Sequence, residues 1–214
     1  MLRRVLVDLS HEIVAGMLTR ADVPSPHLTV AVPRAVSGVS FEVESLTLVG
    51  NTGTYLDAPY HYHEDRADLA RLPLERLVGV PITVVRAFGR QAVTALDLGD
   101  PDRLWGSAVL VYTGWARHWG TPRYLNLDCS HLTAGAVDAL VDANAALVGI
   151  DSVSIDDPDD PARTAHARLL GADIPIIENL TNLDAVPDTG SRLTVLPAPV
   201  RAMGSFPVRA VAVV

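Results

Sequence analysis

The chain has 214 residues, of which 49% are apolar and 20% are charged, values typical of a globular protein and unlike those of disordered, collagen-like or coiled-coil chains. Its formal net charge is −8 and its basic residues form no large cluster, which argues against a nucleic-acid or anionic-membrane surface. We therefore expect its partners to be small molecules or further copies of itself, and the length fits one domain over residues 1–214.

The amino-terminal apolar run is broken by Asp8 and is too short for the hydrophobic region of a signal peptide. No stretch reaches the roughly 18 uninterrupted apolar residues of a membrane helix. The single cysteine, Cys129, has no partner for an internal disulfide and is expected to be a packed thiol. Together these features predict a cytoplasmic protein without membrane contact.

Short β-branched runs between Gly, Pro and Asp residues predict the strands. In chain order they are Val5–Leu9, Val39–Val49, Ile82–Ala87, Val109–Thr113, Ala146–Ile150, Ile174–Glu178 and Arg209–Val213. In the second of these runs the alternation of apolar residues changes phase after Val43, which is typical of a bulge or a bend in a strand.

Helical periodicity is clearest after Thr133, a predicted N-cap, where apolar residues fall on one face before the next strand. A second helix is expected over Thr164–Leu170 with Gly171 in the C′ position, and a third, short helix over Leu69–Leu77. Because strands dominate the first half and helices alternate with strands in the second, we predict an α/β domain with a mixed sheet.

The segment between residues 51 and 63, NTGTYLDAPYHYH, differs from the rest of the chain in composition. It concentrates tyrosines and histidines around a turn that carries Gly53 and Pro59. Polar aromatic rings and imidazoles at a turn are poor core material and suit the wall of a binding pocket. A polar surface hairpin is the alternative interpretation.

This segment resembles the metal-binding motif His-x-Gly-Thr-His-x-Asp-x-Pro-x-His of the cyclase family that includes bacterial kynurenine formamidase and isatin hydrolase. The matching residues are Gly53, Thr54, Asp57, Pro59 and His61. Asn51 and Tyr55 stand where the motif has histidines. Further matches in the same order along the chain are Asp8–His11, Tyr112–Trp115, Val148–Asp151, the pair His166 and Glu178, and Gly204–Val211. The resemblance implies the mixed-sheet fold of that family and a homodimer or homotetramer.

The resemblance also implies two adjacent metal ions. Of the residues that would hold them, Asp57, His166 and Glu178 remain in this chain, whereas the amide of Asn51 and the phenol of Tyr55 do not replace imidazoles near neutral pH. Three protein ligands meet the minimum for one catalytic ion, and zinc or manganese suits this set. We therefore expect at most one divalent ion, with a metal-free acid/base site as the alternative.

For the reaction, the resemblance implies hydrolysis of a C–N bond in a small cyclic or aryl amide. A carboxylate beside an imidazole raises its basicity, so we expect His61, with Asp57 nearby, to act as general acid/base. The Tyr55 hydroxyl is expected to donate a hydrogen bond to an oxyanion that forms on the substrate.

Three further residues are predicted to bind the substrate. Trp115 follows a predicted strand end and is expected to cover a planar substrate, Tyr62 is a second hydrogen-bond donor, and His11 is expected in the pocket wall. Two other functions stay open: a metal-independent cyclase or dehydratase of secondary metabolism that uses the same pocket, and a catalytically silent ligand-binding paralogue.

Overall fold

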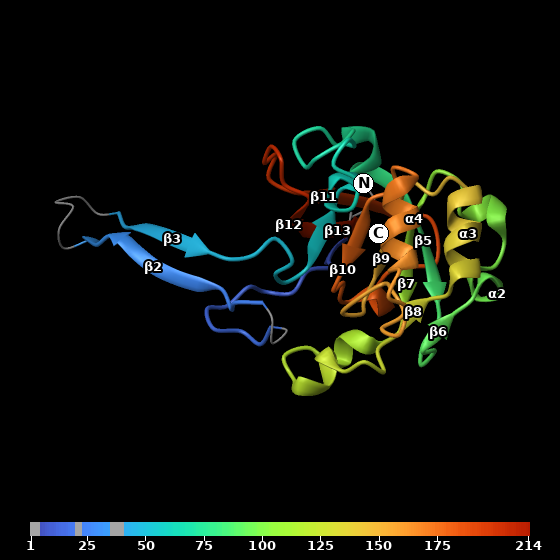
Figure 1. Cartoon of the computed structure of the whole chain (residues 1–214), viewed down its shortest axis with the longest axis horizontal. Helices are drawn as coiled ribbons and strands as arrows, with labels where there is room; N and C mark the ends of the chain where they lie inside the picture. The colour runs from blue at the N-terminus through green and yellow to red at the C-terminus, as the bar shows by residue number, and fades with distance from the viewer. Residues whose placement is uncertain (1–4, 20–22, 35–40) are drawn as a thin grey trace.

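A nine-stranded mixed sheet forms the centre of the part of the chain that the computed structural model describes, residues 5–19, 23–34 and 41–214 (Figure 1). In spatial order its strands are β1 (Leu6–Asp8), β13 (Arg209–Val213), β11 (Arg192–Leu196), β5 (Val78–Arg86), β7 (Ala108–Tyr112), β9 (Leu147–Ile150), β10 (Ile176–Glu178), β4 (Tyr55–Asp57) and β12 (Ser205–Pro207). The neighbours from β5 to β10 pair in parallel, and the pairs toward both edges are antiparallel. The predicted α/β class with a mixed sheet is therefore confirmed.

Two hydrophobic cores cover the two faces of this sheet. The central strand β7 supplies both, because Leu110 packs into one core and Val109 and Val111 into the other. A continuous apolar run is what a strand buried on both faces requires. Helices α2 (Ala95–Leu98), α3 (Ala134–Asp142) and α4 (Thr164–Gly171) lie together beside the parallel strands, over the second core (Figure 1). Within the described ranges no helix has the length and apolarity needed to cross a membrane.

The three predicted helices have different outcomes. Helix α3 begins where expected, with the Thr133 hydroxyl accepting a hydrogen bond from the backbone N–H of Ala136 at 3.3 Å. Helix α4 is also present, but Gly171 is its last helical residue rather than C′, and the left-handed conformation falls on Asp173, with φ of 59°. A Cβ at Gly171 would lie 3.2 Å from His63 Nε2, so the glycine leaves room for that ring.

The helix predicted over Leu69–Leu77 is wrong. This segment forms turns and a single 3₁₀ turn, η2 (Leu74–Arg76), that starts after Pro73. Proline lacks a backbone N–H and disfavours helical geometry in the residue before it, so the leucines reach the core from turns instead.

Each predicted strand run overlaps a strand, although residues 39 and 40 of the second run lie outside the described residues. That run holds β3 (Val43–Thr47), which pairs with the unpredicted β2 (His27–Val32). The irregularity predicted near Val43 occurs in the partner strand, between Val30 and Val32. The other unpredicted strands are β4, β11 and β12 and the short parallel pair β6 (Ala92–Val93) and β8 (His131–Leu132).

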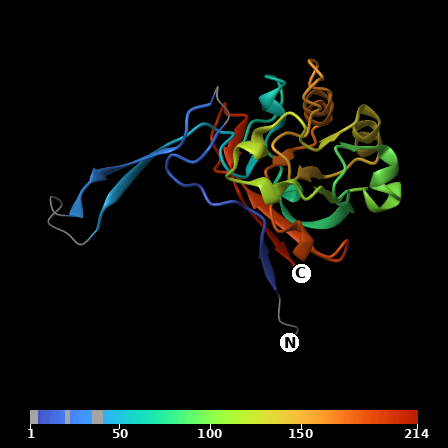
Figure 2. The same ribbon diagram turned by 90° about the horizontal axis from the view of Figure 1, so that it is seen from below.

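The antiparallel ribbon of β2 and β3, called the arm below, projects from the body of the molecule in both views (Figures 1 and 2). Leu28 and Leu46 are cross-strand partners, Val30 shares their face, and Thr29 and Ser45 pair on the other face. All residues of the arm are exposed. One face of the ribbon is therefore largely apolar, with Glu44 as the partner of Val30, and this face points to solvent.

Candidate functional site

The loop that precedes β4 is fixed by hydrogen bonds to the end of β10. The Thr54 hydroxyl donates to the carbonyl of Asn179 at 2.5 Å, and the Asn179 side chain donates to the carbonyl of Gly53 at 2.6 Å. Gly53 has φ of +65°, and a Cβ there would lie 2.9 Å from the Ile13 side chain. The glycine of the motif is thus required both by its backbone conformation and by close packing.

Strand register brings the titratable residues of the site together. β4 lies between β10 and β12, so that Tyr55 is opposite Glu178 and Asp57 is opposite Ser205. The chain then turns through η1 (Pro59–His61), which carries His61 toward the same end of the sheet. Residues far apart in sequence therefore meet at the edge that β4 and β12 form.

Asp57, His166 and Glu178 form a buried cluster whose ligand atoms lie within 4.8 Å of one another. His166 Nε2 is 3.4 Å from Asp57 Oδ2 and 3.6 Å from Glu178 Oε1. Ligands about 2.0–2.2 Å from a tetrahedral ion lie about 3.3–3.6 Å from one another. Asp57 Oδ2 is buried and has no hydrogen-bond partner among the described residues. The spacing and this available oxygen fit one divalent ion.

Asp156 fixes the orientation of His166. Its carboxylate accepts a hydrogen bond from His166 Nδ1 at 2.5 Å and from the backbone N–H of Ala165 at 2.8 Å. Burial lowers the pKa of His166, but the negative charges of Glu178 and Asp57 and the hydrogen bond to Asp156 outweigh it and raise that pKa well above its usual value. A carboxylate on Nδ1 leaves Nε2 directed at the cluster, the arrangement that metal-binding histidines usually have.

Tyr55 is buried with its hydroxyl donating to Glu178 Oε2. Burial and the negative charges of Glu178 and Asp57 raise the pKa of Tyr55 well above 10, so the phenol stays a neutral donor. Burial also raises the pKa of Glu178, whose Oε1 accepts a hydrogen bond from the backbone N–H of Ile155 at 2.6 Å.

Asn51 does not complete a second metal site. Its amide nitrogen lies 3.4 Å from Asp57 Oδ1 and donates to it. With the hydroxyl of Tyr55 engaged by Glu178, neither residue presents a strong ligand atom to an ion. The residues present therefore fit one ion and do not fit the pair of ions that the family motif implies.

His61 is exposed at the cavity and is linked to the cluster through Ser205. The Ser205 hydroxyl donates to Asp57 Oδ1 and lies 3.0 Å from His61 Nδ1. The ring centroid of His61 is 6.1 Å from that of His166. An imidazole, the side chain used most often in general acid/base catalysis, therefore lies beside the cluster of Asp57, His166 and Glu178.

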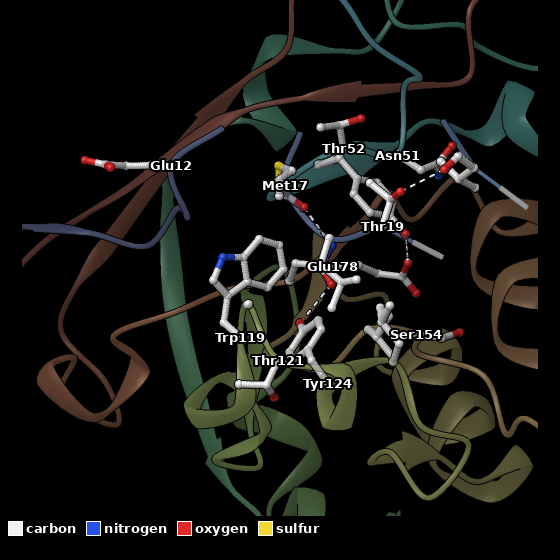
Figure 3. Close-up of a pocket in the computed structure, with 18 of the residues that line it drawn as sticks. Glu12, Met17, Thr19, Asn51, Thr52, Trp119, Thr121, Tyr124, Ser154 and Glu178 are labelled. Atoms are coloured by element: carbon white, nitrogen blue, oxygen red, sulfur yellow. Dashed lines mark hydrogen bonds between the residues drawn. The ribbon is translucent and has the colours of Figure 1, made fainter. Parts of the chain in front are cut away.

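A cavity of about 490 Å³ opens over this cluster. Tyr55, His61, His166 and Glu178 are at its base, and its lining is mostly apolar and aromatic. Trp119 and Tyr124 lie on one side, and Met17 of the amino-terminal segment lies on the other (Figure 3). A small planar molecule would be enclosed between these walls and the titratable residues.

The predicted substrate-binding residues have different positions. Tyr62 lines the cavity and stacks on His166, with ring centroids 5.4 Å apart. His11 stacks on Trp119 at 3.9 Å, behind the wall, and burial lowers the pKa of His11 to about 4. Trp115 is outside the described lining, because its ring is buried and its Nε1–H donates to the carbonyl of Tyr124. The expectation that Trp115 covers a planar substrate is corrected: the half-buried Trp119 supplies the indole in the described lining of the cavity.

Several residues of the site were not singled out from the sequence. No sequence pattern points to Asp156, and Ser205 belongs only to the matched segment Gly204–Val211. Their roles depend on contacts with His166 and with Asp57, which are 10 and 148 residues away. Trp119 directly follows the 3₁₀ turn η4 (Trp115–His118), and no sequence pattern points to it as a cavity residue.

The chain is similar to known proteins both in sequence and in fold. A model of the Cyclase family, described as "Putative cyclase", matches residues 7–157. A kynurenine formamidase from Paracidovorax citrulli is 30% identical over 174 residues, 79% of this chain and 78% of that protein. Isatin hydrolase A from Labrenzia aggregata, bound to benzyl benzoate, matches with a TM-score of 0.87 and 23% identity over 99% of this chain and 94% of that one. A "predicted metal-dependent hydrolase" from Bacillus stearothermophilus matches with a TM-score of 0.81 and 23% identity over 99% and 98%.

Proposed function

Because this chain belongs to the cyclase family, we propose that it is a hydrolase that cleaves a C–N bond in a small cyclic or aryl amide. The observation that carries the proposal is the buried cluster of Asp57, His166 and Glu178 at the base of an aromatic cavity, with His61 beside it. Relatives named kynurenine formamidase and isatin hydrolase support the same reaction class.

In this proposal Asp57, His166 and Glu178 would hold one divalent ion, zinc or manganese. When bound, such an ion supplies Lewis acidity for the carbonyl group of an amide. Asp156 keeps His166 Nε2 directed at the cluster, and Tyr55 orients the carboxylate of Glu178 through its hydroxyl.

The proton transfers are assigned to His61. As water adds to the amide carbon, Nε2 of His61 accepts a proton from the water oxygen. When the C–N bond breaks, the same nitrogen returns that proton to the leaving amine, so that water is consumed and an acid and an amine are formed. The exposed position of His61 at the cavity leaves this nitrogen accessible to substrate.

The walls of the cavity favour a flat, partly apolar substrate. Trp119 and Tyr124 offer aromatic faces, and Tyr62 adds an exposed hydroxyl beside His166. Stacking on such rings contributes about 0.5–1.5 kcal/mol beyond the burial of apolar area. An aryl amide or a lactam fused to an aromatic ring meets these requirements.

The proposal is tested with purified protein by elemental analysis and by hydrolysis assays on N-formylkynurenine and isatin, before and after chelation. The expected result is one equivalent of divalent ion per chain, with turnover that chelation abolishes and zinc or manganese restores. Tight binding without turnover of any amide would instead identify a ligand-binding paralogue. Two equivalents of ion that resist dialysis would contradict the single-ion site.

Replacement of His61 tests the acid/base assignment. We expect His61→Ala to reduce kcat about 10²–10⁴-fold with little change in KM, because proton transfer is lost while substrate binding remains. Steady-state kinetics and a thermal melt measure both effects. Full activity at saturating substrate would remove His61 from the mechanism and move the role to His63 or His166.

A metal-independent cyclase or dehydratase is the second candidate. It is favoured by the hydrogen bond from Tyr55 to Glu178 and by the raised pKa of His166, which give the cluster internal partners and a compensating positive charge. Turnover that persists after complete removal of divalent ions, with no hydrolysed amide among the products, would support this candidate over the hydrolase.

A further inference from the structure

Ser205 occupies a specific place between the metal-ligand cluster and the proposed acid/base. Its side chain is buried, and its hydroxyl oxygen contacts Asp57 Oδ1 on one side and His61 Nδ1, at 3.0 Å, on the other. Ser205 is not part of the described lining of the cavity. It therefore acts through His61 rather than on the substrate.

The hydroxyl of Ser205 has a single hydrogen atom, and this determines which group donates in each of its two hydrogen bonds. An ionised carboxylate only accepts hydrogen bonds, so the single hydroxyl hydrogen of Ser205 is donated to Asp57. The serine oxygen can then only accept from His61, and Nδ1 must carry a hydrogen. The described residues provide no hydrogen-bond partner for His61 Nε2. In neutral His61 this second nitrogen consequently has a free lone pair.

The backbone around Ser205 holds its hydroxyl close to the imidazole of His61. Ser205 pairs with Asp57 across β12 and β4, and the Ala58 N–H donates to the carbonyl of Gly204 at 2.7 Å. A Cβ at Gly204 would lie 2.6 Å from His61 Cα. Glycine at this position therefore lets β12 approach η1 closely enough for the serine hydroxyl to reach the imidazole.

We infer that Ser205 is a positioning residue that holds His61 in the Nδ1–H tautomer and connects it to Asp57 in a chain of two hydrogen bonds. The proton-accepting nitrogen is thereby always the one at the cavity. When Nε2 gains a proton, the charge on the imidazole is stabilised through Ser205 by the carboxylate of Asp57. The catalytic consequence rests on the proposed function, whereas the tautomer does not.

The tautomer is measured directly by ¹⁵N NMR of histidine-labelled protein, as purified and with added zinc, since protonated and unprotonated imidazole nitrogens resonate far apart. His61→Gln identifies the two signals by their loss. For neutral His61 we expect a protonated Nδ1 and an unprotonated Nε2 in the parent chain, and a mixture of tautomers in Ser205→Ala. A parent with hydrogen on Nε2, or unchanged populations in Ser205→Ala, would overturn the inference.

Kinetics then test the catalytic consequence. Ser205→Ala should lower kcat about 10–100-fold with KM within twofold, and Ser205→Thr, which keeps a hydroxyl, should restore most of the loss. Ser191→Ala is the matched control, because Ser191 is equally buried and its hydroxyl has no partner among the described residues. Equal losses in Ser205→Ala and Ser205→Thr would contradict the role. If no amide is hydrolysed, the NMR result still decides the tautomer, so failure of the proposed function is distinguishable.

Discussion

Tyr55 holds a position where the family motif has a histidine, and its hydroxyl serves a neighbouring carboxylate. In Tyr55→Phe the ring remains, but the Glu178 carboxylate loses a buried hydrogen-bond donor. We expect a loss of about 1–3 kcal/mol in the free energy of unfolding and at least a tenfold fall in kcat. Denaturant unfolding and steady-state kinetics measure the two effects.

Tyr60→Phe is the control for this experiment, since Tyr60 belongs to the same segment but lies outside the described lining of the cavity. It should leave kcat within twofold of the parent. If Tyr55→Phe also matches the parent in activity and stability, the hydroxyl has no role and the ring of Tyr55 only fills space.

The backbone of β4 and of the loop before it determines which side chains point toward the candidate metal site. Because the backbone of this segment is held by Gly53, Thr54 and Asn179, new side chains at positions 51 and 55 should start from defined directions. We expect Asn51→His combined with Tyr55→His to raise the metal content from one to two equivalents per chain.

Elemental analysis after exhaustive dialysis checks this expectation, and each single substitution is a control that should stay at one equivalent. A double variant that also stays at one equivalent, with an unchanged circular dichroism spectrum, would mean that the loop has lost the ligand geometry as well as the ligands.

Local pattern explains which elements and site residues could be predicted. Helix α3 has a capping threonine and a clear apolar face, and β7 is a continuous apolar run, so both elements can be predicted from the sequence. β4 and β12 have three residues each, too few for an alternation to be recognised. Asp57, His166 and Glu178 are recognisable through the resemblance to the family, and the fold brings their ligand atoms within 4.8 Å of one another.

Ser205 and Asp156 could not be identified in that way. Their contacts arise from the pairing of β12 with β4 and from the loop that precedes α4, and these depend on the fold rather than on a local sequence pattern. The sequence favours Trp115 for the cavity wall because it follows a predicted strand end, but the fold of the 3₁₀ turn (Trp115–His118) buries that ring, and the half-buried Trp119 lines the cavity instead.

For the whole molecule, we propose that the arm mediates association of two copies of the chain. A two-stranded ribbon is marginally stable alone in water, and the arm has an uncovered apolar face that extends beyond the body. Closed twofold symmetry lets each copy supply both an arm and a surface that receives one. Sedimentation equilibrium of the parent chain should give the mass of a dimer or a dimer of dimers.

Leu28→Lys with Leu46→Glu places an opposite-charge pair on the apolar face of the arm and should shift the protein to monomers. Thr29→Lys with Ser45→Glu makes the same change on the polar face and should leave the mass unchanged. A parent chain that is monomeric at micromolar concentration would remove this function from the arm.

The pairing of β12 with β4 also has a consequence for how the protein is made. Asp57 and His61 are synthesised long before Ser205, which lies 148 residues after its carboxylate partner Asp57. Contacts between such distant segments form late because the intervening chain must first be ordered. A nascent chain that has passed Glu178 but has not reached Ser205 therefore contains every proposed metal ligand and the proposed base, but not the strand that aligns them. We expect catalytic competence to arise only after Ser205 has emerged and β12 has paired with β4.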